Sequence, residues 1–375
     1  MSSFGQAATT ATWVYASAET GAPPTELKLL LPDQFSPELR RESESFLETQ
    51  RTAHPFQLPD WGAQEDSAYA MQRVRGELRL FARCGIIWPL GRRFDHLRAL
   101  TISRGPICDD AELTRLSLLQ LVQICRARNF LYVDVNPDLV GADADRLEAW
   151  LSENKWFAAG PERASLRVDL RLKLEEILRT FRKTTRYEIR RADTAAIKIL
   201  EASDENSCER FLSLYFDMAA NKGFAPDPEQ HMRRVLTSLL HNRNRGVLLI
   251  ASREGEALGG IVVVRAGSRC WYIWGATRKK SEVNVGHLLQ WSAMRWAKQQ
   301  GCTEYDLGGY QERATDGPAL FKRGFSQSIV RFMTTYRYIT NPMAYNAFKV
   351  VHRGFNALRA VVPLSAHLAH QRVSR

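Results

Sequence analysis

Residues 247–275, VLLIASREGEALGGIVVVRAGSRCWYIWG, contain three apolar runs separated by short polar turns. VLLIA and LGGIVVVR flank the turn REGEA, which predicts a β-hairpin, and SRCWYIWG predicts a third strand. Apolar residues then recur at helical spacing from about Val285 to Gln300, and TEYDL (303–307) predicts another strand. The second half of the chain is therefore expected to run strands, helix, strand.

The first half repeats this order. Short apolar runs between Tyr69 and Ile107 predict an antiparallel meander, a helix comes next, and FLYVDV (130–135) predicts a buried strand. The strand after each helix carries a Tyr–Asp feature, and its aspartates, Asp134 and Asp306, lie 172 positions apart (306 − 134). Solenoid repeats are only about 20–50 residues long, so this spacing indicates a duplicated domain.

The predicted fold class is α/β (α+β), with two tandem domains that each contain a mixed, mostly antiparallel sheet flanked by helices. We expect a loose lead-in at 1–26, a first domain at 27–165 and a second at 166–339. A C-terminal helix within 340–375 is expected to complete the first domain.

Composition narrows the class of protein. The 375 residues are 45% hydrophobic and 25% charged, an ordinary globular balance. The six cysteines are scattered without a metal or redox spacing, which favours buried thiols in a reducing compartment and no metal site. The sequence starts without a secretory signal pattern, and no apolar run reaches the roughly 18 residues of a membrane span. A cytoplasmic location is therefore expected.

The net charge of +11 favours a polyanionic partner, although arginine-rich surfaces are also common without one. The densest positive charge is FRKTTRYEIRRA, within a helix expected at about 173–194. On a helix Arg182, Arg186 and Arg190 fall at i, i+4 and i+8 and form one cationic stripe. The stripe is either a phosphate-binding surface or a merely solvated face.

Several familiar catalytic motifs are missing from the sequence. It contains no G-x-S-x-G, H-E-x-x-H, Walker or G-x-G-x-x-G pattern. A serine hydrolase, a metallohydrolase and a nucleoside triphosphatase are thus poorly supported. Direct group transfer, in which positioning and charge stabilisation provide the catalysis, fits better.

Two short motifs near the end of the second half could carry that chemistry. In YDLGG (305–309) the two glycines at a strand end would let a ligand approach the backbone, or they form an ordinary turn. In ALFKRGF (319–325) Lys322 lies among aromatic residues, where it is either fixed beside a reacting carbonyl or a surface lysine with a buried stem.

In combination these motifs resemble the Fem family, a branch of the acetyltransferase-like (GNAT) superfamily. KTTRYEIRRA, the helix GHLLQWSAMRWAKQQG, YDLGG and FKRGF occur in the family's order. In the first half HPFQLPDWG (54–62) resembles its Q-x-x-x-W entry and SRGP (103–106) its Gly-Pro strand end. The resemblance covers about residues 45–345.

The resemblance implies two GNAT-like domains, with a catalytic BioF2-like acetyltransferase second domain and a helix returning to brace the first. It implies transfer of an amino acid from aminoacyl-tRNA to an amine of a nucleotide- or lipid-linked peptidoglycan precursor, in cell wall biogenesis, with no bound cofactor. Phe321 and Lys322 match the family's Phe–Lys pair, and the lysine would stabilise the acyl-transfer transition state. Other residues are expected to bind substrate: Arg186, Lys222 and Tyr272, which would hold a diphosphate, and Arg190, Trp274, Asp306, Gly308 and Gly309.

The sequence also departs from the family. The long helical-hairpin arm of some members is missing, and KKSEVNVG (279–286) is at best a degenerate pyrophosphate loop, which favours a donor bulkier than coenzyme A. An acyl-CoA or carrier-thioester donor, used to modify an envelope polysaccharide or lipid, remains an alternative, and a non-catalytic polyanion-binding protein is a third. The general base is open, because Asp306, the substrate or water could each take the proton.

The tail at 342–362 is amphipathic, with apolar residues recurring at three and four positions. It would either pack on the first domain or contact the inner face of the membrane, where lipid-linked precursors lie.

Overall fold

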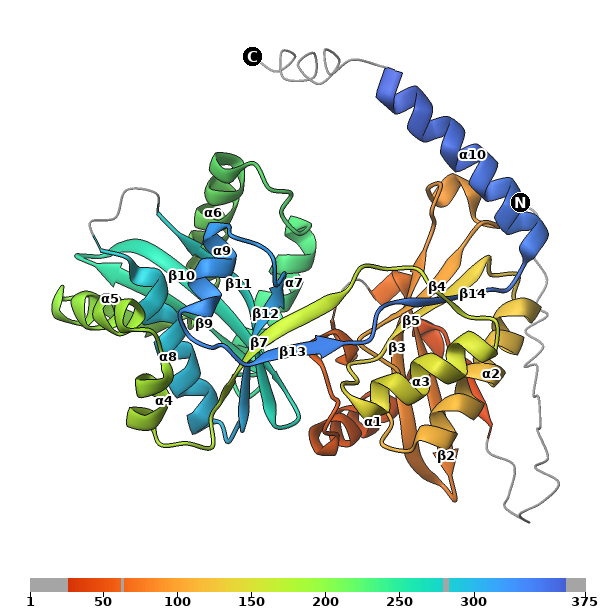
Figure 1. Ribbon diagram of the computed structural model, residues 1–375, viewed down its shortest axis with the longest axis horizontal. Coiled ribbons are helices and arrows are strands. Elements are labelled where there is room, and N and C mark those ends of the chain that lie inside the picture. Colours follow the sequence, from red (N-terminus) through yellow and green to blue (C-terminus); the bar gives the residue numbers. More distant parts are fainter. Residues whose placement is uncertain (1–25, 62–63, 279–282, 362–375) are drawn as a thin grey trace.

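The computed structural model describes residues 26–61, 64–278 and 283–361, so nearly all of the predicted lead-in lies outside the described residues. The chain forms two lobes, each built around one seven-stranded sheet, and β7 and β13 extend across the space between them (Figure 1). The predicted α/β fold with two tandem GNAT-like units is confirmed. No helix of the described ranges is both long and apolar enough to cross a membrane.

The first sheet is antiparallel except where β4 pairs in parallel with β5. In spatial order its strands are β1 (Leu27–Leu30), β2 (Ser67–Val74), β3 (Glu77–Ile87), β4 (Ala99–Ser103), β5 (Tyr132–Asn136), β14 (Tyr336–Ile339) and β6 (Phe157–Ala158).

The second sheet has the same plan, with one parallel pair between β11 and β12. In spatial order its strands are β13 (Ile329–Phe332), β7 (Arg163–Asp169), β12 (Glu304–Tyr310), β11 (Arg269–Thr277), β10 (Glu256–Ala266), β9 (Gly246–Arg253) and β8 (Lys198–Glu201).

Helices connect and cover these strands. The α-helices are α1 (Pro37–Thr49), α2 (Ala111–Ala127), α3 (Ala142–Glu153), α4 (Leu174–Thr180), α5 (Lys183–Thr194), α6 (Glu205–Lys222), α7 (Glu229–His241), α8 (Val285–Gln299), α9 (Gly317–Arg323) and α10 (Pro342–Val361). Short 3-10 helices are η1 (Pro32–Gln34), η2 (Pro55–Gln57), η3 (Gln64–Asp66) and η4 (Arg92–Phe94).

Local sequence sets several helix ends. Asp110 begins α2 and Asp316 begins α9, in each case because the carboxylate accepts backbone N–H groups of the first turn. Gly301, directly after α8, has a φ of +77°, a conformation that favours glycine. Such capping fixes where α9, which carries the Phe–Lys pair, starts.

The two halves exchange strands. β7, which begins at the end of the first half, pairs with β12 in the second sheet, and β14, which is the last strand of the second half, pairs with β5 in the first. The division at 27–165 and 166–339 remains a prediction. The exchange means that residues 336–339 are hydrogen-bonded into the first sheet and residues 163–165 into the second.

The core is continuous between the lobes. One apolar cluster joins Phe35, Tyr69 and Phe81 of the first half to Phe211 and Trp271 of the second. In the second half α6 and α7 pack on one face of the sheet, and α4, α5 and α8 on the other. The six cysteines are free and buried, as predicted.

The helix predicted at 173–194 was wrong in one respect, because it is interrupted. Phe181 has an extended backbone (φ −72°, ψ 152°) between α4 and α5, and its ring is buried against Trp291 and Phe325. Burial of this ring stabilises the break. Arg182 is consequently the N-cap residue of α5, not part of a continuous three-arginine stripe.

The start of α10 contacts the first sheet. Tyr345 and Phe348 are buried in a cluster with Ala99, Leu131 and Tyr132. Met343 and Val350 on the same helix are 85% and 73% exposed. In Figure 1 α10 starts beside the first lobe and its later turns project above the lobe, away from the sheet.

Candidate active site

The parallel strands β11 and β12 part soon after they pair. Their register runs from Arg269 opposite Glu304 to Trp271 opposite Asp306, and no further. Beyond this point Tyr272, Ile273 and Trp274 border two cavities, one of about 770 Å³ and one of about 220 Å³. The gap between the parallel strands therefore lies where the two cavities meet.

The larger cavity, here called the cleft, is walled by β11, the first turn of α8, α9, α5 and α6. Residues of different elements line it, among them Glu188, Lys222, Tyr272, His287, Phe321 and Lys322. The smaller cavity, here called the boundary cavity, lies where the halves meet. Its lining includes His54, Trp61, Arg104, His231, Asp306 and Gly309.

Lys322 lies beside the gap. Its Nζ donates to the Gly309 carbonyl at 2.6 Å and lies 5.9 Å from the centre of the Tyr272 ring. Burial lowers the pKa of Lys322 to about 8, against the opposing effect of Asp306 and Asp316. A half-buried ammonium is thus fixed at the edge of the cleft, still mainly charged at neutral pH.

Aromatic contacts position α9. Phe321 meets Phe325 edge-on, with ring centroids 5.2 Å apart, and meets the His287 ring at 4.9 Å. Phe325 also packs against Phe181. The Phe–Lys pair is therefore held against the same ring cluster that breaks the helix between α4 and α5.

The turn after Asp306 is shaped for close approach. Gly308 has a φ of +73°, and a Cβ there would lie 3.2 Å from the Tyr272 carbonyl and 3.7 Å from Lys322 Nζ. Asp306, 2% exposed, accepts hydrogen bonds from the Ser165 hydroxyl, the Gly308 N–H (2.8 Å) and Arg167 Nε (3.2 Å). This carboxylate organises the turn, and its oxygens are already occupied by these donors.

A cluster of arginines lies beside the boundary cavity. The fully buried side chain of Asp138 pairs with Arg104 at 2.7 Å and with Arg163 and Arg269 at 3.2 Å. Arg167 is 3.7 Å away. Burial alone would raise the pKa of Asp138, but the neighbouring positive charges keep it well below its usual range.

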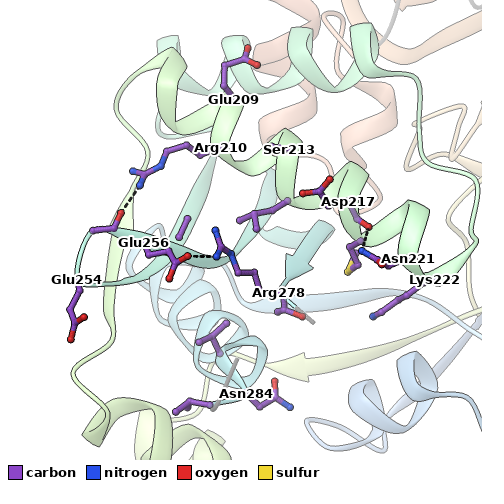
Figure 2. A pocket seen from close by; sticks show the side chains of 17 residues that line it. Glu209, Arg210, Ser213, Asp217, Asn221, Lys222, Glu254, Glu256, Arg278 and Asn284 are labelled. Atoms are coloured by element: carbon purple, nitrogen blue, oxygen red, sulfur yellow. Dashed lines mark hydrogen bonds and ion pairs between the residues drawn. The ribbon is translucent and has the colours of Figure 1, made fainter. Parts of the chain in front are cut away.

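A third cavity, of about 1250 Å³, continues from the cleft (Figure 2). It lies between α6, the β9–β10 turn, the end of β11 and the start of α8, and it shares Met218, Lys222, Thr277 and Asn284 with the cleft. In Figure 2 Arg278 reaches Glu256, whereas Lys222 projects from the far end of α6. Lys222 thus stands where the two cavities join.

Comparisons with known proteins agree with this architecture. Residues 179–323 match the model of an acetyltransferase (GNAT) domain. The chain is 20% identical, over 61% of its length and 72% of the relative's, to the UDP-N-acetylmuramoylpentapeptide-lysine N(6)-alanyltransferase of Weissella viridescens. It is 27% identical to the lipid II:glycine glycyltransferase of Staphylococcus aureus, over 26% of this chain and 25% of that protein. The crystal structure of FemX superposes with a TM-score of 0.72 at 16% identity, covering 82% of this chain and 98% of FemX. These findings support a Fem-type protein of the GNAT superfamily, with an acetyltransferase (GNAT) domain over residues 179–323.

A further solved structure has the same fold. L-PGS from Bacillus licheniformis superposes on this chain with a TM-score of 0.54 at 13% identity, covering 85% of this chain and 96% of that one. The family model ends at the Phe–Lys pair and begins just before α5, so it spans the cleft.

The structure brings most of the predicted site residues together. Phe321, Lys322, Lys222, Tyr272 and Trp274 line the cleft. Asp306, Gly308 and Gly309 line the boundary cavity, which Tyr272 and Trp274 also border.

Two predicted residues lie elsewhere. Arg186 donates to the carbonyls of Phe181 at 2.5 Å and Arg179 at 3.2 Å, across the break between α4 and α5. Arg190 is exposed. Neither lines the cleft or the cavities that adjoin it, and a role in substrate binding stays a prediction for both.

Other lining residues carry no clear signal in the sequence. Glu188 was only the single acid in a basic run, and His287 was one of eight histidines without a ligand pattern. The Asp138 cluster draws arginines from three strands or strand ends, so nothing local could indicate it. Among the described residues, no group of three or more His, Cys, Asp or Glu is placed to hold a metal.

Proposed function

We propose that this protein transfers an amino acid from aminoacyl-tRNA to an amine of a peptidoglycan or related envelope precursor. The observation that carries the proposal is the position of Lys322, whose ammonium lies at the gap between two cavities. The names of the relatives support the acceptor side of the proposal, since one is a UDP-N-acetylmuramoylpentapeptide-lysine alanyltransferase and the other a lipid II:glycine glycyltransferase.

The reaction requires stabilisation of one developing charge. The acceptor amine attacks the acyl carbonyl carbon, and a tetrahedral oxyanion forms. Lys322 Nζ donates a hydrogen bond to this oxyanion. It either leaves the Gly309 carbonyl to do so or uses another of its three N–H groups. One such donor in a water-poor site accounts for about 10²–10³ in rate.

The two cavities suit two substrates. In the proposal the donor occupies the cleft, which is large and continues past Lys222 into the third cavity. The acceptor enters through the boundary cavity, where Arg104 provides positive charge and Trp61 and Trp274 provide apolar faces. Lys222 and Tyr272 remain the candidates for contacting substrate phosphate.

A thioester donor is the second candidate, because residues 179–323 match an acetyltransferase domain. Coenzyme A or an acylated carrier protein would then donate to an envelope polysaccharide or lipid. The non-catalytic polyanion-binding alternative leaves the buried cluster around Phe321 and the fixed Lys322 without a role.

The donor can be identified with the purified protein. A nucleotide- or lipid-linked muropeptide is incubated with aminoacyl-tRNA labelled in the amino acid, or with labelled acyl-CoA, each with and without ribonuclease. We expect label to enter the muropeptide from aminoacyl-tRNA and ribonuclease to abolish it. Ribonuclease-resistant transfer from acyl-CoA would support the thioester donor, and no transfer from either would contradict the enzyme assignment.

Membrane contact through residues 342–362 is a further part of the proposal. Tyr345 and Phe348 pack on the first sheet, which leaves the exposed Met343 and Val350 available for a lipid surface. Residues 317–375 contain no Asp or Glu, so an anionic inner leaflet would attract this segment. Flotation with anionic liposomes should be lost when residues 342–375 are deleted, whereas equal flotation would exclude this contact.

A further inference from the structure

His287, on the first turn of α8, lines the cleft beside the Phe–Lys pair. Its ring packs edge-on against Phe321 at 4.9 Å and lies 5.6 Å from the ring of Phe325. These contacts hold the imidazole plane in place. The residue before Lys322 in the chain thus also fixes the orientation of His287.

One ring nitrogen of His287 is buried without a partner. Nδ1 has no hydrogen bond to any of the described residues. The imidazole as a whole is half-buried and lines the cleft. An oriented imidazole therefore lies at the wall of the space where the reacting groups would meet.

The charges around His287 come from each wall of the cleft. Glu188 on α5 is the acid, and Arg182 on α5, Lys222 on α6 and Lys322 on α9 are the cations. Burial lowers the pKa of His287, and Glu188 opposes this shift. The imidazole is consequently neutral near pH 7 and able to accept a proton.

Acyl transfer to an amine needs such an acceptor, because the nitrogen must lose a proton as the C–N bond forms. Lys322 is a charged donor, and the oxygens of Asp306 are occupied by Ser165, Gly308 and Arg167. Neither is suited to take the proton.

We propose that His287 is the catalytic base of the transfer, an inference that rests on the proposed function. The amine nitrogen adds to the acyl carbon and gives one proton to Nε2. The tetrahedral intermediate then collapses, the bond from carbon to the leaving oxygen (or sulfur) breaks, and the imidazolium returns the proton to that leaving atom. The products are an amide and a neutral alcohol or thiol, and His287 is neutral again.

The test compares His287→Gln and His287→Ala with His96→Gln, a change at an exposed histidine of the first half. Single-turnover transfer is measured from pH 5 to 9. We expect both His287 variants to lose about 10²-fold or more in rate together with the rising acid limb of the wild-type profile. Added imidazole should restore part of the activity of His287→Ala, and His96→Gln should match the wild type.

Glu188→Gln provides an independent readout. Because Glu188 raises the pKa of His287, its neutralisation should move the acid limb to lower pH without removing it. A His287→Gln variant that keeps its acid limb and a rate within threefold of the wild type would overturn the inference while leaving the proposed function intact. A wild type without transfer activity would instead overturn the proposed function.

Discussion

The two halves have the same strand plan but treat their parallel pair differently. In the first half β4 and β5 pair from Leu100–Val133 to Ser103–Asn136, and the chain then folds back so that Ile107 exchanges two hydrogen bonds with Phe81. In the second half the pair ends at Trp271–Asp306, and the strands beyond it border the cleft and the boundary cavity. The strand plan of the sheet is duplicated, whereas the proposed chemistry depends on the parts of β11 and β12 that extend beyond their parallel pairing.

In the first half the buried side chain of Gln57 bridges the strands next to the parallel pair. We call this the closed half, and we call the second half, whose strands border the two cavities, the open half. Gln57, fully buried, donates to the carbonyls of Ser103 at 2.7 Å and Arg83 at 3.1 Å and accepts from the Arg83 N–H at 2.8 Å. A Cβ on Gly105 would lie 2.7 Å from the Gln57 side chain. The Q-x-x-x-W and Gly-Pro motifs of the sequence thus meet each other in the closed half.

Both halves retain one feature of the duplication. Asp134 lies directly opposite Arg337 on the neighbouring antiparallel strand, and Asp306 lies directly opposite Arg167. In each half this ion pair joins the post-helix strand to the strand exchanged from elsewhere in the chain. The shared aspartate is therefore a framework residue, and in the second half it also shapes the turn at Gly308.

The largest expected effect is a difference in stability and transfer rate between alanine variants of Asp306 and Asp134. Asp306→Ala removes a buried acceptor of three hydrogen bonds and should cost about 3–5 kcal/mol of unfolding free energy, together with a slower transfer. Asp134→Ala removes the partner of a more exposed Arg337 and should cost about 1.5–3 kcal/mol without slowing transfer. Urea unfolding and single-turnover rates measure both. Equal losses of activity in the two variants would contradict the view that only the aspartate of the second half shapes the active site.

Removing the hydrogen bonds of Gln57 in the closed half should lower the unfolding free energy without slowing the chemical step. Gln57→Ala leaves one backbone N–H and two carbonyls without their partner and should lower the unfolding free energy by about 2–4 kcal/mol. The transfer rate at a temperature well below unfolding should stay near that of the wild type. A rate loss larger than tenfold at saturating acceptor in a folded variant would mean that the first half contributes to the chemical step as well as to the boundary cavity.

The pH dependence tests the charge on Lys322. Its pKa is lowered to about 8, so the charged form is lost as the pH rises through that value. The wild-type rate should fall by up to about tenfold per pH unit above pH 8, relative to Lys322→Arg, whose guanidinium stays charged. Comparing the two proteins cancels ionisation of the acceptor amine. Parallel profiles from pH 7 to 10 would contradict either the lowered pKa of Lys322 or a role of its charge in transfer.

The smallest effect concerns the two glycines of the open half. Gly308→Ala forces a side chain onto a positive φ and toward the Tyr272 carbonyl, and should cost about 1 kcal/mol and lower the rate. Gly309→Ala is the matched control, because a Cβ there meets nothing within 4 Å. Thermal unfolding and transfer rates compare the pair, and indistinguishable variants would show that the turn is not strained.

The sequence predicted the strand order and α8 because apolar periodicity and turn residues are local. It placed Lys322, Tyr272 and Lys222 in one cleft through a resemblance of motifs in their order. It missed the break at Phe181, because the burial that stabilises it comes from Trp291 and Phe325, more than 100 positions away. It missed His287 for the same reason, since the position of a half-buried imidazole at a cavity wall is a property of packing.

The most direct test of the open half is the transfer rate of Lys322→Met, measured in single turnover with saturating donor. The methionine side chain is one heavy atom shorter than that of lysine and carries no charge, so the unfolding midpoint should change little while the rate falls about 10²–10³-fold. A folded Lys322→Met protein that transfers within a few-fold of the wild type would contradict the assignment of the oxyanion-stabilising group to Lys322.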